Sequence, residues 1–262
     1  HEHNFYDSPL TCESASGKSA FAIARADLRG WGGLYLSGLG SGHLGVSTRI
    51  SKRFDEERVV VRRDMTSEGI QSPWRVIMLA DTQGQLIEST LIANLNPPTS
   101  ITDTSWIKPG KTAWDWWSGP YLPPPLKGGT DMMTIKRYID FASASGFPYM
   151  LIEEGWCMNS GIGGSAPQQA EITRTKPDLN MPELVRYAAD RNVGLWLWVQ
   201  WKLLDRQMEA ALDQYQAWGI KGIKVDFMDR NDQEIDDYYH RVMSKAAEHE
   251  LMVNMHGAYP PT

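Results

Sequence analysis

The strongest constraint on the fold is the alternation of strand-like and helix-like segments that begins after the Pro97-Pro98 pair. Alternation of this kind predicts a parallel sheet with helical crossovers, either doubly wound or closed into a (β/α)₈ barrel. We predict five strands, in the stretches "KTAWDWW", "PYMLIEEGW", "VGLWLWVQW", "IKGIKVDFM" and "LMVNMHGA", and helices near 131–145, 182–191, 205–218 and 232–249. Gly146 and Gly219 lie where a glycine is expected after a helix, and Asp205 and Asn231 are candidate N-caps.

Two observations favour the barrel over the doubly wound sheet. No glycine-rich phosphate-binding turn follows the first strand. Polar residues also come at the carboxyl end of every strand, where the active face of a barrel is built: Asp115, Glu154, Gln200, Asp226 and His256. A complete barrel takes about 250 residues, so the segment from Thr112 to Thr262 accounts for only part of one.

The residues before Pro98 show a different pattern, with short strand-like runs broken by glycine and polar turns. This pattern predicts an antiparallel sheet. The runs are "SAFAIARA", "GGLYLSG", "ERVVVRRD", "PWRVIMLA" and "QLIESTLIANL". We therefore divide the chain into residues 1–100, an antiparallel part, and residues 101–262, an α/β part.

Composition excludes several classes of partner. The net charge is −6 and no basic run occurs, so neither nucleic acid nor an anionic membrane surface is favoured. No apolar stretch approaches the roughly 20 residues of a membrane span, and the first residues lack a signal-peptide pattern. Cys12 and Cys157 are the two cysteines of the sequence, and they form neither a zinc pattern nor a disulfide framework. The 11 Trp and 10 Tyr suit stacking on sugars as well as an ordinary core.

The fourth strand carries the most informative residues. Because residues two apart share a face, Lys224 and Asp226 lie on one side and Val225 and Phe227 on the other. A buried carboxylate tends to protonate, and we expect the Lys224 ammonium to keep Asp226 ionised and to donate to a substrate hydroxyl. An ionised, oriented carboxylate can attack a glycosidic carbon. The alternative is a buried ion pair without a catalytic role.

The other strand ends supply candidate pocket residues. In "AWDWW", Trp114 and Trp116 share one face while Asp115 and Trp117 share the other, and Asp115 is either a ligand of sugar hydroxyls or a cap.

In "LIEEGW" we expect Glu154 and Trp156 to face the site and Glu153 to point away from it. His256 ends the fifth strand as either a site residue or a structural one. No His/Glu cluster has the spacing of a transition-metal site, and the acidic helix start "NDQEIDDYYHR" is more typical of a solvated face than of a calcium loop.

Several motifs together resemble glycoside hydrolase family 97, whose members are α-glucosidases and α-galactosidases. In chain order they are "SPWRVIMLAD", "LIANLNPP", "DTSWIKPGKTAWDWW", "LIEEGW", "GIKGIKVDFMDR" and "NMHGAYPPT". The resemblance runs from about Gly17 to Thr262 and implies a β-sandwich, a (β/α)₈ barrel and a small C-terminal β domain. It implies that residues 1–100 are the C-terminal portion of the sandwich and that residues 101–262 are the N-terminal half of the TIM barrel, with about five strands.

The strand ends resemble one branch of the family. Inverting members carry base glutamates at the third and fifth strands, the latter in a His-Glu stretch, whereas this chain has no Glu in "LWLWVQW" and reads His256-Gly257. Asp226 at the fourth strand resembles the nucleophile of the retaining α-galactosidases. The resemblance places their acid/base Glu beyond the fifth strand, outside this chain. Lys224 resembles the sugar-binding lysine of other retaining α-galactosidase families. The other candidate substrate-binding residues are those at the strand ends, namely Asp115, Trp116, Glu154, Trp156 and His256.

We therefore expect a retaining α-glycosidase that cleaves terminal α-galactosides through a covalent glycosyl-enzyme. The alternatives are an α-glucosidase of the same family and a non-catalytic carbohydrate-binding fragment. The resemblance also implies a periplasmic or secreted protein, and calcium in the full-length protein. No calcium ligands are assignable in this chain, since it reads Ala24-Arg25-Ala26 where many members read Thr-Glu-Ala and an arginine repels the ion. Unpaired strand edges of a partial barrel would favour self-assembly.

Overall fold

The computed structural model describes residues 5–40, 42–43, 45–64, 69–116 and 119–259. The chain divides into two compact units. One comprises His1–Ser100, Asp229–His240 and Tyr259–Thr262, and the other comprises Ile101–Met228 and Arg241–Ala258. The units therefore differ from the two continuous segments that we predicted, because residues 229–240 group with the N-terminal part.

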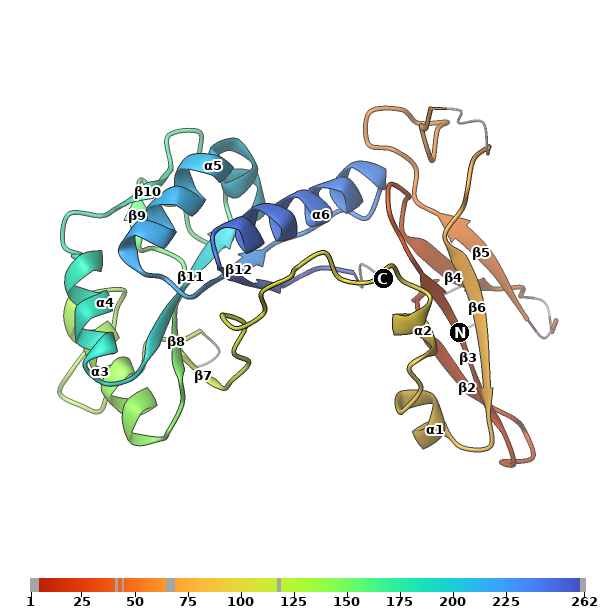
Figure 1. Cartoon of the computed structure of the whole chain (residues 1–262), viewed down its shortest axis with the longest axis horizontal. Helices are drawn as coiled ribbons and strands as arrows, with labels where there is room; N and C mark the ends of the chain where they lie inside the picture. Colours follow the sequence, from red (N-terminus) through yellow and green to blue (C-terminus); the bar gives the residue numbers. More distant parts are fainter. Residues whose placement is uncertain (1–4, 41, 44, 65–68, 117–118, 260–262) are drawn as a thin grey trace. The chain divides into compact units, whose positions relative to one another are not determined.

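The second unit is built on a five-stranded parallel sheet, which confirms the predicted α/β fold class (Figure 1). Each predicted strand lies beside the next predicted strand along the chain, in the order β13-β12-β11-β8-β7. The strands are β7 (Thr112–Trp114), β8 (Tyr149–Ile152), β11 (Gly194–Gln200), β12 (Gly222–Asp226) and β13 (Met252–Met255). Every residue of β8 and β12 is buried, as expected of strands covered on both faces. The closed eight-stranded barrel stays a prediction.

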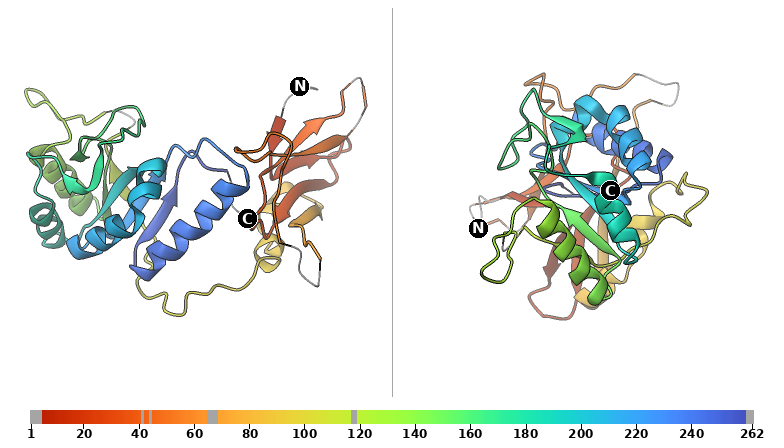
Figure 2. Two further views of the ribbon diagram at one scale, coloured as in Figure 1. Left: turned by 90° about the horizontal axis from the view of Figure 1, so that it is seen from above. Right: turned by 90° about the vertical axis from the view of Figure 1, so that its left-hand side faces the viewer.

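Helices connect the strands of the sheet. Right-handed crossovers between sequential parallel strands place their helices on the same side of a sheet, and Figure 2 shows the helices along the sheet. The helices that pack on the strands are α3 (Met132–Ala144), α4 (Met181–Ala189) and α5 (Trp201–Trp218). Helix α6 (Gln233–Glu248) connects β12 to β13, and its residues up to His240 group with the first unit. Between β8 and α4, the antiparallel pair β9 (Cys157–Met158) and β10 (Glu171–Thr175) forms a small sheet that we did not predict.

The helix ends confirm the glycine predictions and correct the caps. Gly146 and Gly219 have φ of 68° and 86°, the left-handed conformation that glycine adopts without a steric cost. The N-cap of α5 is Gln200, so Asp205 lies inside the helix and its predicted capping role is wrong. Before α6, it is the Asp232 carboxylate, not Asn231, that accepts from the amide of Glu234.

The first unit contains two antiparallel three-stranded sheets, as the pattern of its sequence predicted. One has the order β1-β4-β5 and the other the order β2-β3-β6. The strands are β1 (Phe5–Asp7), β2 (Leu10–Glu13), β3 (Ala20–Ala26), β4 (Leu34–Gly38), β5 (Val46–Ile50) and β6 (Trp74–Ala80). That these sheets belong to a β-sandwich stays a prediction.

Two predicted strands of this unit are wrong. "QLIESTLIANL" forms the short helices α1 (Gln83–Ile87) and α2 (Leu91–Asn94), and α1 begins with a capping box between Thr82 and Gln85. "ERVVVRRD" forms no strand, since the backbone N–H and C=O of Arg62 bond to the side chain of Gln233 at 2.8 and 2.7 Å.

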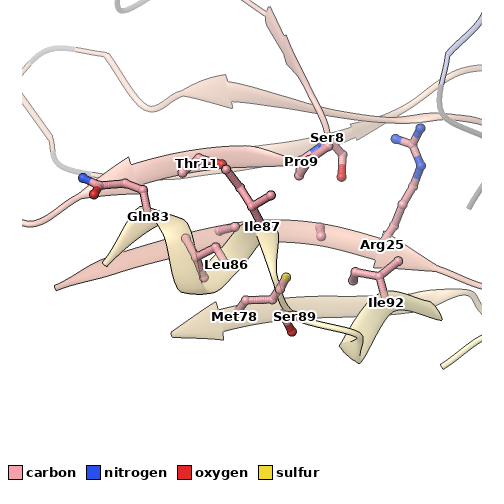
Figure 3. A pocket seen from close by; sticks show the side chains of 12 residues that line it. Ser8, Pro9, Thr11, Arg25, Met78, Gln83, Leu86, Ile87, Ser89 and Ile92 are labelled. Carbon is pink, nitrogen blue, oxygen red and sulfur yellow. The ribbon is translucent and has the colours of Figure 1, made fainter. Parts of the chain in front are cut away.

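Helices α1 and α2 pack over the β2-β3-β6 sheet and leave a cavity of about 300 Å³ (Figure 3). Small side chains on β3, Ala22 and Ala24, leave the space, and Leu86 and Ile92 line it from the helices. No carboxylate is among the described side chains that line the cavity. A paired-carboxylate site must therefore lie elsewhere.

In the described part of the chain, no helix has the length and apolar character needed to cross a membrane.

Candidate active site

The register of the parallel strands brings polar side chains together at one edge of the sheet. Trp198 of β11 pairs with Lys224 of β12, and Gln200 pairs with Asp226. Paired residues of neighbouring strands share a face, as do residues two apart in one strand. Trp198, Lys224 and Asp226 therefore lie on one face at the carboxyl end of the sheet.

Lys224 lies between two carboxylates. Its Nζ is 2.7 Å from Oε1 of Glu153 and 3.4 Å from Oδ2 of Asp226, and all three side chains are buried. The same Nζ is 4.3 Å from the centre of the Trp114 ring. The ion pair and the aromatic ring offset the free-energy cost of removing the Lys224 ammonium from water. The predicted proximity of Lys224 and Asp226 is thus present, with Glu153 as a third member of the cluster.

Three hydrogen-bond donors hold the Asp226 carboxylate. Oδ1 accepts from the amide of Phe227 at 2.6 Å and lies 2.9 Å from Nδ1 of His256, and Oδ2 accepts from Nε1 of Trp198 at 2.9 Å. Burial raises the pKa of Asp226, but the bonds from Trp198, His256 and Phe227 and the charge of Lys224 together lower it below the ordinary value. Lys224 contributes to this shift less than Trp198 and His256 do.

The two neighbouring carboxyl groups shift the other way. Burial raises the pKa of Glu153, and the hydrogen bond and charge of Lys224 only partly oppose it. Burial also raises the pKa of Asp115 to about 6, against its own backbone amide and Lys224. Oδ1 of Asp115 is buried and has no hydrogen-bond partner among the described residues. Trp116, next along the chain, is exposed, and Trp117 lies outside the described residues.

The structure reverses the predicted directions of Glu153 and Glu154. Glu153 contacts Lys224, whereas the Glu154 carboxylate accepts from the amides of Gly163 and Gly164 in the following loop. The alternation could not be read from the sequence, because all four residues of β8 are apolar and buried.

Trp156 also departs from its predicted place. Its side chain is 1% exposed, its Nε1 donates to the carbonyl of Trp198 at 2.8 Å, and its ring contacts the rings of Tyr215 and Trp218. Trp156 therefore packs in the core behind the sheet and does not face Asp226. The sequence analysis missed Trp198, although the alternate tryptophans of "LWLWVQW" mark one face of a strand.

The calcium that the resemblance implies for the full-length protein stays an expectation. In the described part of the chain, no group of three or more His, Cys, Asp or Glu side chains is placed to hold a metal ion. Arg25 is itself buried, where its Nη1 lies 3.3 Å from Oδ1 of Asp7 and donates to the carbonyl of Leu34 at 2.9 Å. We assign no step to a metal.

Comparison with known proteins places this geometry in a family. The fold defines an α/β protein whose polar residues gather where parallel strands end, with antiparallel sheets preceding them. The family model described as glycoside hydrolase 97 matches residues 114–262, and the model of the glycosyl-hydrolase 97 N-terminal region matches residues 1–98. The chain belongs to glycoside hydrolase family 97.

Two curated relatives are identical to the chain at about a third of the aligned residues. A protein of Bacteroides thetaiotaomicron named retaining alpha-galactosidase is 34% identical over 97% of this chain and 39% of the relative. A probable retaining alpha-galactosidase of Streptomyces bingchenggensis is 34% identical over 75% of this chain and 30% of the relative. The chain thus spans about two-fifths or less of these relatives.

Solved structures show the same fold. A glycoside hydrolase family 97 enzyme from Pseudoalteromonas sp. strain K8, in complex with acarbose, superposes with a TM-score of 0.82 at 21% identity. It matches 98% of this chain and 43% of its own. A β-arabinopyranosidase superposes with a TM-score of 0.69 at 24% identity and matches 100% of this chain and 40% of its own.

Proposed function

We propose that the protein is a retaining α-glycosidase that acts on terminal α-galactosides, with Asp226 as the nucleophile. The observation that carries the proposal is the Asp226 carboxylate, which three donors orient and hold ionised beside Lys224 at the carboxyl end of the sheet. The names of the curated relatives support the reaction class.

The proposed reaction is a double displacement. An oxygen of Asp226 forms a bond to the anomeric carbon as the glycosidic bond breaks, and the leaving oxygen takes a proton from the acid/base Glu that the resemblance places beyond this chain. Water then attacks the same carbon, its proton passes to that Glu, and the bond to Asp226 breaks. Two inversions give net retention. Lys224 and Asp115 hold sugar hydroxyls, and His256 orients the nucleophile.

The conformation around Gly257 supports retention over inversion. Gly257 has φ of 59°, and a Cβ at this position would lie 3.4 Å from Oδ1 of Asp226. Inverting members resemble one another in carrying a Glu in the corresponding His-Glu stretch. A carboxylate there would approach Asp226, and the repulsion of like charges would favour its protonation. Glycine at 257 and an ionised Asp226 are therefore compatible.

A glycosyl fluoride tests the nucleophile without the acid/base group, since fluoride leaves without protonation. A 5-fluoro-α-galactosyl fluoride should transfer its sugar to Asp226, with a mass gain of one fluorohexosyl group that peptide mapping locates. The bond from Asp226 to C1 forms as the C1–F bond breaks. The Asp226→Asn variant should gain no mass, while the surface control Asp205→Asn should react like the wild type. Labelling at another residue would exclude Asp226.

Turnover by the protein gives a second test. The first-formed sugar from an aryl α-galactoside should be the α anomer by NMR, and Asp226→Gly with azide should yield a β-glycosyl azide. Parallel assays on aryl α-glucosides distinguish the glucosidase alternative, because the two sugars differ only at C4. Sugar binding without labelling or turnover would support a non-catalytic module.

A further inference from the structure

The Glu154 carboxylate has both oxygens committed to the backbone of one loop. Oε1 accepts from the amide of Gly163, and Oε2 accepts from the amide of Gly164 at 2.9 Å. Both glycines have positive φ, 63° and 74°, so the two successive amides point into the concave side of a turn. Glu154 therefore fixes the shape of this loop from the end of β8.

The backbone of Gly164 packs against the aromatic ring of Phe227. A Cβ on Gly164 would lie 2.3–2.5 Å from three carbons of the Phe227 ring, so the ring lies directly on the glycine backbone. The ring also contacts the ring of Trp198 edge to face, with centroids 6.3 Å apart. Phe227 is nevertheless 42% exposed, so this exposed ring keeps its position through the loop and Trp198.

Phe227 has a left-handed backbone conformation, with φ of 62°. A bulky side chain rarely adopts this conformation unless its surroundings impose it. The amide of the same residue donates to Oδ1 of the preceding residue, Asp226, at 2.6 Å. Trp198, whose ring contacts that of Phe227, donates to Oδ2 of the same carboxylate. Two of the three donors to Asp226 therefore belong to Phe227 itself and to a side chain that its ring contacts.

We propose that Glu154 is a positioning residue for Asp226, acting through the Gly163-Gly164 turn and the Phe227 ring. The carboxylate fixes the turn, the turn seats the ring, and the ring holds the Phe227 amide and the Trp198 indole against the two oxygens of Asp226. This role replaces direct sugar binding by Glu154. The catalytic consequence rests on the proposed function of Asp226, whereas the structural chain of contacts does not.

Glu154→Gln is the sharpest variant, because the carboxamide keeps the shape but turns a donor toward one of the two glycine amides. Glu171→Gln is the matched control, since Glu171 lies on β10 and its carboxylate pairs only with the exposed Arg174 among the described contacts. Phe227→Ala removes the ring and retains the amide. Circular dichroism and thermal unfolding would show that each variant is folded.

The first readout is an NMR measurement that requires neither labelling nor turnover. The indole N–H resonance of Trp198, assigned with Trp198→Phe, should move in Glu154→Gln and in Phe227→Ala but not in Glu171→Gln. The side chains of Glu153 and His256, which contact Lys224 and Asp226 at this site, are unchanged in all three variants. If only the Gly163 and Gly164 amides move in Glu154→Gln, the influence of Glu154 ends at the loop and the proposal is wrong.

The second readout is the rate of labelling by the galactosyl fluoride. A misplaced nucleophile should lower the maximal rate constant about tenfold or more and change the half-saturating concentration by less than about threefold. The opposite split, weaker binding at an unchanged rate constant, would show that Glu154 contacts the sugar and would overturn the proposal. If the wild-type protein is not labelled at Asp226, the proposed function fails, and the Trp198 resonance still decides the positioning role.

Discussion

At the scale of the residue, the three carboxyl groups around Lys224 differ in their surroundings and therefore in their pKa. Asp226 accepts from three donors and its pKa is lowered, whereas burial away from water raises the pKa values of Glu153 and Asp115. Environments that separate the pKa values of neighbouring acids allow them different tasks. Asp226 suits the ionised role, and Asp115, with a pKa of about 6, changes charge near neutral pH.

This difference predicts a pH-dependent gain in stability from Asp115→Asn. The pKa of Asp115 is about 6 in the folded protein and 3.8 as its ordinary value, so the folded state binds more protons between these pH values. Stability then falls as pH rises through this window, and the full penalty is present above pH 6. The variant should exceed the wild type by up to about 3 kcal/mol near pH 7, with the difference lost below about pH 4.

Urea unfolding at a series of pH values measures this effect. Asp103→Asn is the control, because the hydrogen bonds of Ser105 lower the pKa of exposed Asp103 and its replacement should bring no gain near neutral pH. A constant difference for Asp115→Asn at every pH would show that packing, not titration, is responsible.

At the scale of the element, the ends of the helices depend on single residues. Helix α5 ends at Gly219, whose amide donates to the carbonyls of Tyr215 and Gln216 with φ of 86°. The turn leads within three residues into β12, which carries Lys224 and Asp226. A residue with a Cβ pays about 1–2 kcal/mol for this conformation, so the connection from α5 to β12 favours glycine.

We therefore predict that Gly219→Ala lowers the free energy of unfolding by about 1–2 kcal/mol. The added Cβ would also lie 3.4 Å from Cγ1 of Val185. Gly84→Ala is the control, because Gly84 lies inside α1, where an added Cβ would make an ordinary contact with Oγ1 of Thr82 at 3.8 Å, and alanine favours a helix. Equal effects of the two substitutions on denaturant unfolding would contradict the conformational explanation.

At the scale of the whole molecule, one face of the β2-β3-β6 sheet carries apolar side chains in register. Leu10, Ile23 and Ile77 pair across the strands in one row, and Cys12, Phe21 and Leu79 pair in the next. Ile77 is 68% exposed and Leu79 is 81% exposed. A contiguous apolar sheet face in water favours association, whereas apolar side chains exposed singly do not.

We predict that the 262-residue chain associates through this face in a concentration-dependent manner. The double substitution Ile77→Lys and Leu79→Lys should lower the sedimentation coefficient at high concentration without changing the far-UV circular dichroism. The control is Ile162→Lys, which alters an exposed side chain of a loop in the second unit. Unchanged sedimentation of the double variant would place the association elsewhere or exclude it.

The sequence by itself determined the order of the parallel strands, the helices between them and the face shared by Lys224 and Asp226. These features depend on local periodicity and on glycine at helix ends, which short segments of sequence record. The sequence did not reveal the structure of two segments. In "QLIESTLIANL" a capping box favours helices over a strand, and the backbone of "ERVVVRRD" bonds to the side chain of the distant Gln233.

Only the tertiary structure decided which neighbours surround Asp226. No sequence pattern shows which of Glu153 and Glu154 faces Lys224, because the preceding strand β8 is apolar on both faces. The donors Trp198 and His256 come from two other strands, and the burial that shifts the pKa of Asp115 comes from packing. Local sequence fixes the direction of a side chain within a strand, whereas its partners depend on the register between strands distant in the chain.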